Sequence, residues 1–225
     1  MFQSDLFEAT PLALVDDAES GIRYLPDVVP QTTAQAWFEQ ALANVTWGNQ
    51  RRLMYERAVD VPRLMARFSL DAPDLPEPLM EAAEQMRSIT GAPFNSVGLN
   101  LYRDGNDSVA PHNDKTQGLV PKAPIAILSL GATRRMTIRA KSGKGRTLHV
   151  DLHPGSVIVM SYASQFTHNH GIPKMSGVEG PRISLAFRCV DPQHLGCPRQ
   201  EERDKTPHFS FEPIAAFFGS NASAS

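Results

Sequence analysis

Two stretches in the first half of the chain repeat apolar residues at the spacing of an α-helix. The first begins at Thr32, which together with Gln35 matches a capping box. Its apolar stripe comprises Trp37, Phe38, Ala41, Leu42 and Val45. The second runs from about Pro76 to Arg87, and its apolar face comprises Leu79, Met80, Ala83 and Met86. The pattern predicts two amphipathic helices, the second of which ends before Gly91.

Short runs that favour β-strands alternate with turn residues from residue 95 onward, whereas the prolines within residues 1–30 predict an irregular start. The predicted strands cover 96–102, 125–130, 136–140, 147–152, 157–162 and 183–190. At the last of them a period of two predicts one face made of Arg182, Ser184, Ala186 and Arg188. The opposite face is made of Ile183, Leu185 and Phe187. Many short strands after early helices predict an α+β fold, mainly β, with a sandwich or barrel flanked by N-terminal helices.

The length of 225 residues fits one structural domain. Within it we distinguish a helical N-terminal region, residues 1–94, and a strand-rich core, residues 95–191. The tail, residues 192–225, is polar and contains several prolines, so we expect it to be partly disordered.

The composition is that of a globular protein, with 41% hydrophobic and 20% charged residues. With a net charge of −2, the surface as a whole is not expected to bind polyanions. Any contact with nucleic acid therefore requires a local basic patch. Cys189 and Cys197 are too few for a disulfide framework and favour a reducing compartment. Because no basic signal peptide and no apolar run of about 20 residues occur, we expect a cytoplasmic protein without membrane contact. We also expect it to be a monomer.

The candidate chemistry starts at His112-Asn113-Asp114. In an extended segment His112 and Asp114 point to the same side, so both can reach one metal ion. Two imidazoles and one carboxylate on one face of Fe(II) leave the opposite face open for a co-substrate and dioxygen. The third ligand stays open between His168 and His170, because a period of two places both on one face.

Arg182 and Arg188 suit a dicarboxylate co-substrate, because a planar guanidinium meets a carboxylate with two parallel hydrogen bonds. They lie six residues apart, which is about 20 Å along a straight strand. They can bracket the two ends of a short diacid only if the strand bends or the side chains converge.

Five segments carry a family resemblance, in the same order and over residues 96–190. They are Asn100-Leu101-Tyr102-Arg103, His112-x-Asp114, Leu128-Ser129-Leu130-Gly131, His170-Gly171-Ile172-Pro173 and Pro181-Arg182-Ile183-Ser184-Leu185-Ala186-Phe187-Arg188. Together they resemble the AlkB family of Fe(II)/2-oxoglutarate dioxygenases. The resemblance implies that residues 95–191 form a catalytic double-stranded β-helix, or jelly roll.

The resemblance also assigns residues to roles. It implies that iron is held by His112, Asp114 and His170, and it selects His170 over His168 because a small residue, an aliphatic residue and proline follow it. It implies a 2-oxoglutarate site lined by Asn100, Tyr102, Arg182 and Arg188. In that site Arg182 pairs with the distal carboxylate and Arg188 lies nearer to the iron.

The activity that the resemblance implies is oxidative dealkylation of N-alkylated bases in DNA or RNA. It uses Fe(II), O2 and 2-oxoglutarate and releases an aldehyde, succinate and CO2. Two alternatives remain: a 2-oxoglutarate-dependent hydroxylase of a protein or small molecule, and a non-catalytic jelly-roll binding module.

Two segments are candidates for contact with nucleic acid. Six basic residues and no acid lie between Ala132 and Arg146, where Ser142-Gly143-Lys144-Gly145 predicts a hairpin turn, and we take Arg134 and Arg135 as phosphate contacts. In the stretch where the resemblance implies a lid, within residues 1–94, Tyr55 or Phe68 is a candidate to stack on a flipped base. Family members often carry an acid two places after the iron aspartate, to accept from a base amino group. Thr116 stands there in this chain, which leaves base preference open.

Overall fold

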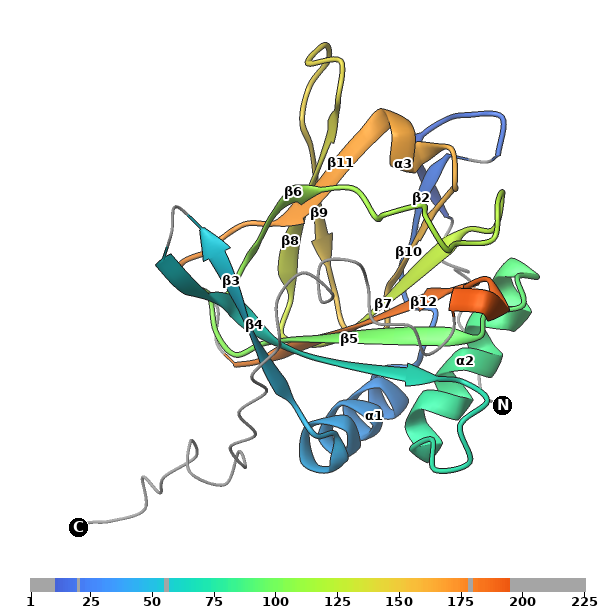
Figure 1. Ribbon diagram of the computed structural model, residues 1–225, viewed down its shortest axis with the longest axis vertical. Helices are drawn as coiled ribbons and strands as arrows, with labels where there is room; N and C mark the ends of the chain where they lie inside the picture. Colours follow the sequence, from blue (N-terminus) through green and yellow to red (C-terminus); the bar gives the residue numbers. More distant parts are fainter. Residues whose placement is uncertain (1–10, 20, 55–56, 178–179, 195–225) are drawn as a thin grey trace, which may run out of the picture.

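A computed structural model of the protein describes residues 11–19, 21–54, 57–177 and 180–194, and it describes no side chains for residues 50–61 (Figure 1). The elements in chain order are β1 (Leu12–Val15), β2 (Ile22–Leu25), α1 (Gln31–Asn44), β3 (Gly48–Met54), β4 (Arg57–Ser69), α2 (Glu77–Thr90), β5 (Ser96–Tyr102), β6 (Val109–His112), β7 (Ile125–Gly131), β8 (Arg134–Ala140), β9 (Leu148–Leu152), β10 (Val157–Met160), α3 (Ser164–Thr167), β11 (His168–Ile172), β12 (Arg182–Arg188) and the 3-10 turn η1 (Pro192–His194).

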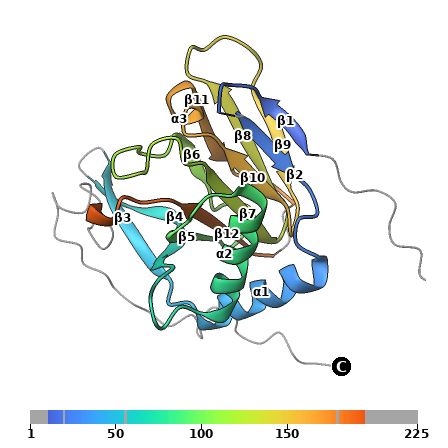
Figure 2. The same ribbon diagram turned by 90° about the vertical axis from the view of Figure 1, so that its right-hand side faces the viewer.

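The strands form two antiparallel sheets. The larger has eight strands in the order β1-β2-β10-β7-β12-β5-β4-β3, and the smaller has four in the order β6-β11-β8-β9. Helices α1 and α2 lie on one side of the large sheet, and the small sheet faces its other side (Figures 1 and 2). The fold is therefore mainly β with flanking N-terminal helices, as predicted.

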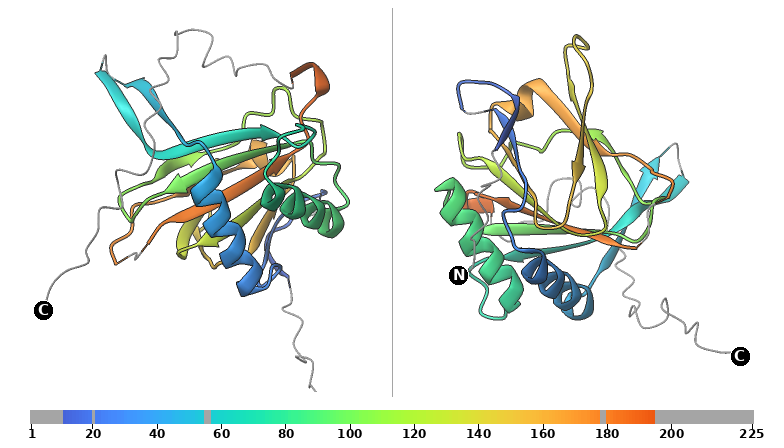
Figure 3. Two further views of the ribbon diagram at one scale, coloured as in Figure 1. Left: turned by 90° about the horizontal axis from the view of Figure 1, so that it is seen from below. Right: turned by 180° about the vertical axis from the view of Figure 1, so that it is seen from behind.

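The two faces of the large sheet bury different apolar clusters. Helices α1 and α2 lie against one face of the large sheet (Figure 3). On this side, Leu185 and Phe187 of β12 pack in the cluster that contains Trp37 of α1 and Met86 of α2. Between the sheets, Ala186 belongs to a second cluster built from both sheets. The alternation of β12 predicted from its sequence is confirmed, and it aims the polar face of this strand into the space between the sheets.

Two helix boundaries and one residue of a helix face differ from their predictions. Helix α1 begins at Gln31 after Pro30 and has no side-chain cap hydrogen bond, so the capping box at Thr32 is wrong. Met80 is 47% exposed and does not share the buried face of α2. That helix runs three residues past its predicted end, to Thr90, and Gly91 caps it at φ 69°, a left-handed conformation that glycine adopts without strain.

The first 94 residues are not only helical, because they hold four strands of the large sheet. The prediction of an irregular start is wrong, since β2 pairs with β10 and β1 pairs with β2. Strands β3 and β4 form a hairpin that joins the sheet where β4 pairs with β5. Strands β6 and β11 were not predicted either; β1, β2, β6 and β11 each have five residues or fewer, too short to establish an alternation. Within the described residues, the longest helices have 14 residues, and none combines the length and apolar character needed to cross a bilayer.

Candidate active site

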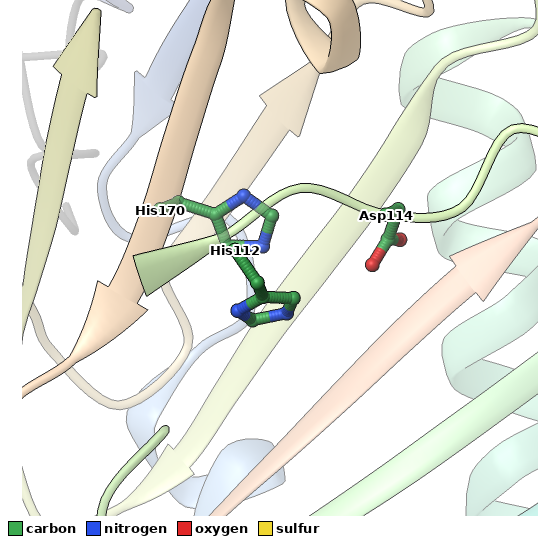
Figure 4. Close-up of side chains that lie close together, drawn as sticks. All are labelled: His112, Asp114 and His170. Carbon is green, nitrogen blue, oxygen red and sulfur yellow. The ribbon is translucent and has the colours of Figure 1, made fainter. Parts of the chain in front are cut away.

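The small sheet brings His112 and His170 together. Strand β11 pairs with β6 in a register that places His170 opposite His112, and the two ring centroids lie 4.6 Å apart. Asp114 follows the end of β6, and its carboxylate lies near the two imidazoles (Figure 4). Each of the three residues offers a ligand atom, and these atoms all lie within 4.8 Å of one another. The set of two neutral nitrogen donors and one anionic oxygen is the set that ferrous iron accepts.

His168, the other candidate for the third ligand, lies away from this cluster. It pairs with Ala140 of β8, two residues from His170 along β11, and its Nδ1 lies 2.9 Å from the Thr167 hydroxyl oxygen. The register of β11 against β6 thus distinguishes the two histidines, which a period of two could not do.

Both clustered imidazoles are neutral at pH 7. Nδ1 of His112 lies 3.0 Å from the carbonyl oxygen of Ala110, which can only accept, so Nδ1 carries the proton and Nε2 keeps its lone pair. Burial lowers the pKa of His112, and burial lowers the pKa of His170 to about 4. Metal ions bind the neutral form of imidazole, so the site requires no deprotonation near pH 7.

Asp114 is held through both its carboxylate and its backbone. Nε and Nη2 of Arg188 each lie 2.7 Å from Oδ2 of Asp114. The backbone N–H of Asp114 donates to Oε1 of Gln165 at 2.9 Å. The two contacts with Arg188 fix the orientation of a carboxylate that can serve as a metal ligand.

Arg182 lies deep in the same pocket and is 1% exposed. Its Nη2 donates to Oγ of Ser129 at 2.8 Å, and its guanidinium carbon lies 5.3 Å from the centre of the Tyr102 ring. Nε and Nη1 have no hydrogen-bond partner in the part of the chain that the structure describes. Burial lowers the pKa of Arg182 to about 10, so the group remains a cation at pH 7.

A buried cation with two unsatisfied donors is costly unless an anion meets it. One carboxylate of a keto-diacid would supply such an anion, and the candidate metal ligands that line the same pocket would supply the second anchor. The residues present therefore fit both iron and 2-oxoglutarate. Arg182 and Arg188 lie about 20 Å apart along the strand, yet both line this pocket, so their side chains converge.

Asn100 and Tyr102 line the wall of the pocket that β5 contributes. Oδ1 of Asn100 accepts from Nε of Arg63 at 2.8 Å, and Nδ2 of Asn100 lies 3.5 Å from Oγ of Ser184. Tyr102 is 3% exposed, and burial raises the pKa of its hydroxyl, which stays protonated at pH 7. This wall presents the polar groups of Asn100 and Tyr102 to a ligand.

Sequence reasoning missed Arg63, Ser129 and Gln165. Arg63 belongs to β4, in which Leu64, Ala66 and Phe68 pack toward the helices. That alternation was present in the sequence, and it would have indicated both the strand and the side to which Arg63 points. No sequence signal links Ser129 to Arg182 or Gln165 to Asp114, since each pair is 50 or more residues apart.

The structure contradicts two substrate-binding predictions. Arg134 is 0% exposed and donates to the backbone carbonyls of Asp104, Asp107 and Pro173 at 2.7–2.8 Å, so it cannot reach a phosphate. Phe68 packs with the cluster between the large sheet and the helices, on the face of β4 opposite to the pocket, so it cannot stack on a base there.

For the remaining substrate candidates, the structure neither supports nor contradicts contact with a substrate. Arg135 is exposed and forms a two-point ion pair with Asp151 of β9, at 2.7 and 2.9 Å, so its charge is already partnered. Thr116 is half-buried, and its carbonyl accepts from the backbone N–H of Leu119. Tyr55 lies outside the described residues.

Arg134→Met is expected to lower the free energy of unfolding by roughly 3 kcal/mol, because three carbonyls lose their donor inside the protein. Urea unfolding measures this change. Arg135→Met, one position along the same strand and exposed, is the matched control and should change the midpoint little. Equal effects of the two substitutions would contradict the structural role assigned to Arg134.

Comparison with known proteins finds one family. Residues 66–188, just over half of the chain, match the family described as the 2OG-Fe(II) oxygenase superfamily. Human "DNA oxidative demethylase ALKBH2" is 32% identical over 126 residues, which are 51% of this chain and 48% of that protein. "Alpha-ketoglutarate-dependent dioxygenase alkB homolog 3" of Bos taurus is 32% identical over 190 residues, 76% of this chain and 66% of that protein. The chain thus spans about half the length of the first relative and about two thirds of the second.

Solved structures with lower sequence identity share the fold. "The structure of OsALKBH1" superposes with a TM-score of 0.51 at 14% identity, over 75% of this chain and 96% of that one. A prolyl hydroxylase of Trichoplax adhaerens, in complex with a hypoxia inducible factor peptide, superposes with a TM-score of 0.57 at 11% identity, over 80% of this chain and 88% of that one. At these identities the likeness concerns the fold alone, and it confirms the predicted jelly roll.

Proposed function

We propose that this chain, which belongs to the 2OG-Fe(II) oxygenase superfamily and is AlkB-like, removes alkyl groups oxidatively from bases of DNA or RNA. It is a dioxygenase whose cofactors are Fe(II) and 2-oxoglutarate. One observation carries the proposal most strongly. A single pocket holds the cluster of His112, Asp114 and His170 together with a buried guanidinium, Arg182, that has two unsatisfied donors.

Each of these residues has a proposed role. His112, Asp114 and His170 hold the iron, and Arg188 orients the Asp114 carboxylate. Arg182, which Ser129 orients, receives the distal carboxylate of 2-oxoglutarate. Asn100 and Tyr102 flank the bound diacid and shield it from water.

When bound, iron with 2-oxoglutarate and dioxygen supplies the oxidation that converts an N-alkyl group to an N-hydroxyalkyl group, with succinate and CO2 as the other products. Arg182 and the three candidate ligands line one pocket, so together they would hold 2-oxoglutarate in a single orientation. The hydroxyalkyl product then breaks its C–N bond and leaves an aldehyde and the unmodified base. No side chain needs to act as a nucleophile in this sequence.

Two observations support a nucleic-acid substrate. The relatives include proteins named as DNA oxidative demethylases. In addition, a projecting hairpin follows β8 (Figure 1). It starts at Lys141, about 10 Å along the strand from Ile138, the residue of β8 that lies opposite His170. The exposed basic residues on this path are Arg139, Lys141, Lys144 and Arg146. These residues replace Arg134 and Arg135 as the proposed phosphate contacts.

Formaldehyde release from a panel of methylated oligonucleotides tests the proposal. The panel contains single- and double-stranded DNA and RNA with methyl groups on different base nitrogens, incubated with Fe(II), 2-oxoglutarate and the full chain. Formaldehyde and succinate in equal amounts from at least one oligonucleotide are expected. Succinate formation that only a peptide or a small molecule stimulates would instead support a hydroxylase of that substrate class.

The basic hairpin can be tested through the salt dependence of binding. Replacing Lys144 and Arg146 by glutamine should weaken oligonucleotide binding and lower the slope of log Kd against log salt by about 1 to 2, since each lost phosphate contact releases one counterion fewer. Arg23 and Lys122 are exposed on other segments, and replacing both by glutamine gives the same change in net charge as a control. If the two double variants shift the slope equally, overall charge and not the hairpin determines binding.

A further inference from the structure

We propose that Gln165 is a positioning residue for Asp114, and that the buried side-chain network behind it sets the affinity of the site for iron. The inference rests on the proposed role of Asp114 as a metal ligand and is independent of which substrate the enzyme oxidises. Gln165 belongs to the short helix α3, and it lies outside the five segments that carry the family resemblance.

The contact begins where strand pairing ends. His112 is the last residue of β6, so Asp114 lies two residues beyond the strand and outside its register with β11. Asp114 is nonetheless 6% exposed, and a buried backbone N–H without an acceptor is costly. Oε1 of Gln165 accepts this N–H at 2.9 Å, and so takes the place of the missing strand partner.

Gln165 is itself fixed by hydrogen bonds. It is 2% exposed, and its Nε2 lies 3.3 Å from Oγ of Ser164 and 3.5 Å from the carbonyl oxygen of Ser161. Nζ of Lys141, on the hairpin side, donates to the Gln165 carbonyl at 2.6 Å. Because both ends of the residue are held, its Oε1 has little freedom to move away from Asp114.

The network continues to the turn between β1 and β2. Oγ of Ser161 accepts from the backbone N–H of Ser164 at 2.9 Å and donates to Oδ2 of Asp17 at 2.5 Å. Oδ1 of Asp17 accepts the backbone N–H groups of Glu19 and Gly21 at 2.7 Å. Ser161 and Ser164 are 3% and 1% exposed. A connected series of hydrogen bonds therefore joins the N-terminal strand pair to the candidate ligand.

The physical consequence concerns the metal. Arg188 orients the Asp114 carboxylate, whereas Gln165 fixes the backbone from which that side chain extends. Without Gln165, the segment that carries Asp114 would have to become ordered when the metal binds. The conformational entropy lost in that ordering would lower the affinity for the metal. Loss of a hydrogen bond that orients a metal ligand commonly costs 10- to 100-fold in affinity, by order of magnitude.

The experiment is a titration of the metal-depleted full chain with Mn(II), a redox-stable substitute for Fe(II), in the absence of nucleic acid. Gln165→Met keeps the size of the side chain and removes its hydrogen bonds, and it should weaken Mn(II) binding about tenfold or more. Gln165→Asn keeps the amide but is one methylene shorter, and it should weaken binding several-fold, about three- to tenfold. Phe166→Ala changes the 56%-exposed neighbour on the same helix and should leave the Kd within about twofold.

Thermal unfolding of the metal-free variants separates positioning from a purely structural role. A lower unfolding temperature with an unchanged Mn(II) Kd, in either Gln165 variant, overturns the proposal. If Gln165→Met does not fold, the Kd of Gln165→Asn decides. Asp114→Ala is titrated in the same way. Wild-type Mn(II) affinity in that variant would contradict both the assignment of Asp114 as a ligand and that of Gln165 as its positioning residue. If no oligonucleotide releases formaldehyde but the Gln165 variants weaken Mn(II) binding as expected, only the nucleic-acid substrate is rejected.

Discussion

Replacing Asp114 by alanine is expected to weaken Mn(II) and Fe(II) binding more than about a hundredfold and to abolish 2-oxoglutarate turnover. The substitution removes the only anion of the cluster and leaves two neutral imidazoles, which alone hold a divalent ion poorly. It also leaves Arg188, whose side chain is only 13% exposed, without the carboxylate that it contacts at 2.7 Å. The expected loss exceeds the roughly 10- to 100-fold range found when only a supporting hydrogen bond is removed.

Two measurements check this expectation: the Mn(II) dissociation constant and the rate of succinate formation under saturating 2-oxoglutarate. Asp151→Ala is the matched control, because Asp151 also pairs with an arginine, Arg135, but on the exposed side of the small sheet. That control should retain both metal binding and turnover. Retained succinate formation in Asp114→Ala would contradict the assignment of the metal cluster.

Replacing Arg182 by methionine is expected to raise the KM for 2-oxoglutarate on the order of a hundredfold while iron affinity stays nearly unchanged. Two charge-assisted hydrogen bonds to a carboxylate contribute roughly 3 kcal/mol, which corresponds to that factor. The Arg182 guanidinium donates to Ser129 and lies against the Tyr102 ring, and neither of these residues is a metal ligand. A raised KM for 2-oxoglutarate together with an unchanged iron affinity is the result that would identify Arg182 as a ligand of the co-substrate alone.

The metal-free protein offers an independent readout of Arg182. Since Nε and Nη1 of its buried guanidinium lack partners in the described structure, Arg182→Met should not lower the unfolding temperature and can raise it. Adding 2-oxoglutarate with Mn(II) should stabilise the wild type more than this variant. Arg135→Met, which removes an exposed arginine, should keep the wild-type response. An equal shift with 2-oxoglutarate in Arg182→Met would show that the diacid binds elsewhere.

Short-range patterns predicted part of the architecture correctly. The alternation in β12 placed Arg182 and Arg188 on the pocket side, and the helical stripe placed Trp37 in the core. Both patterns work because the side-chain period follows from backbone geometry within a single element. Strands β1 and β6, of four residues each, escaped detection because they hold too few residues to establish a period. Strand β10 is equally short and was predicted, because all four of its residues are apolar.

Arg134 illustrates the main limit for assigning surfaces. It stands among basic residues of a hairpin, and the sequence suggested a phosphate contact. Yet it lies at the start of β8 with its side chain directed inward, where it binds three carbonyls from distant loops. Charge in a sequence does not reveal the side of a sheet to which it points. The alternation of β8 does reveal it, because a period of two places Arg134 on the same face as Met136 and Ile138.

The amino-acid sequence by itself determined the donor types of the candidate site, the mainly β class and the order of the motifs, since these depend on residue identity and local period. Only the tertiary structure decided which histidine meets His112, which arginine is buried without an anion, and how Gln165 holds Asp114. These outcomes depend on strand register and on contacts between residues more than 50 positions apart. Long-range packing sets such contacts, and no local pattern encodes them.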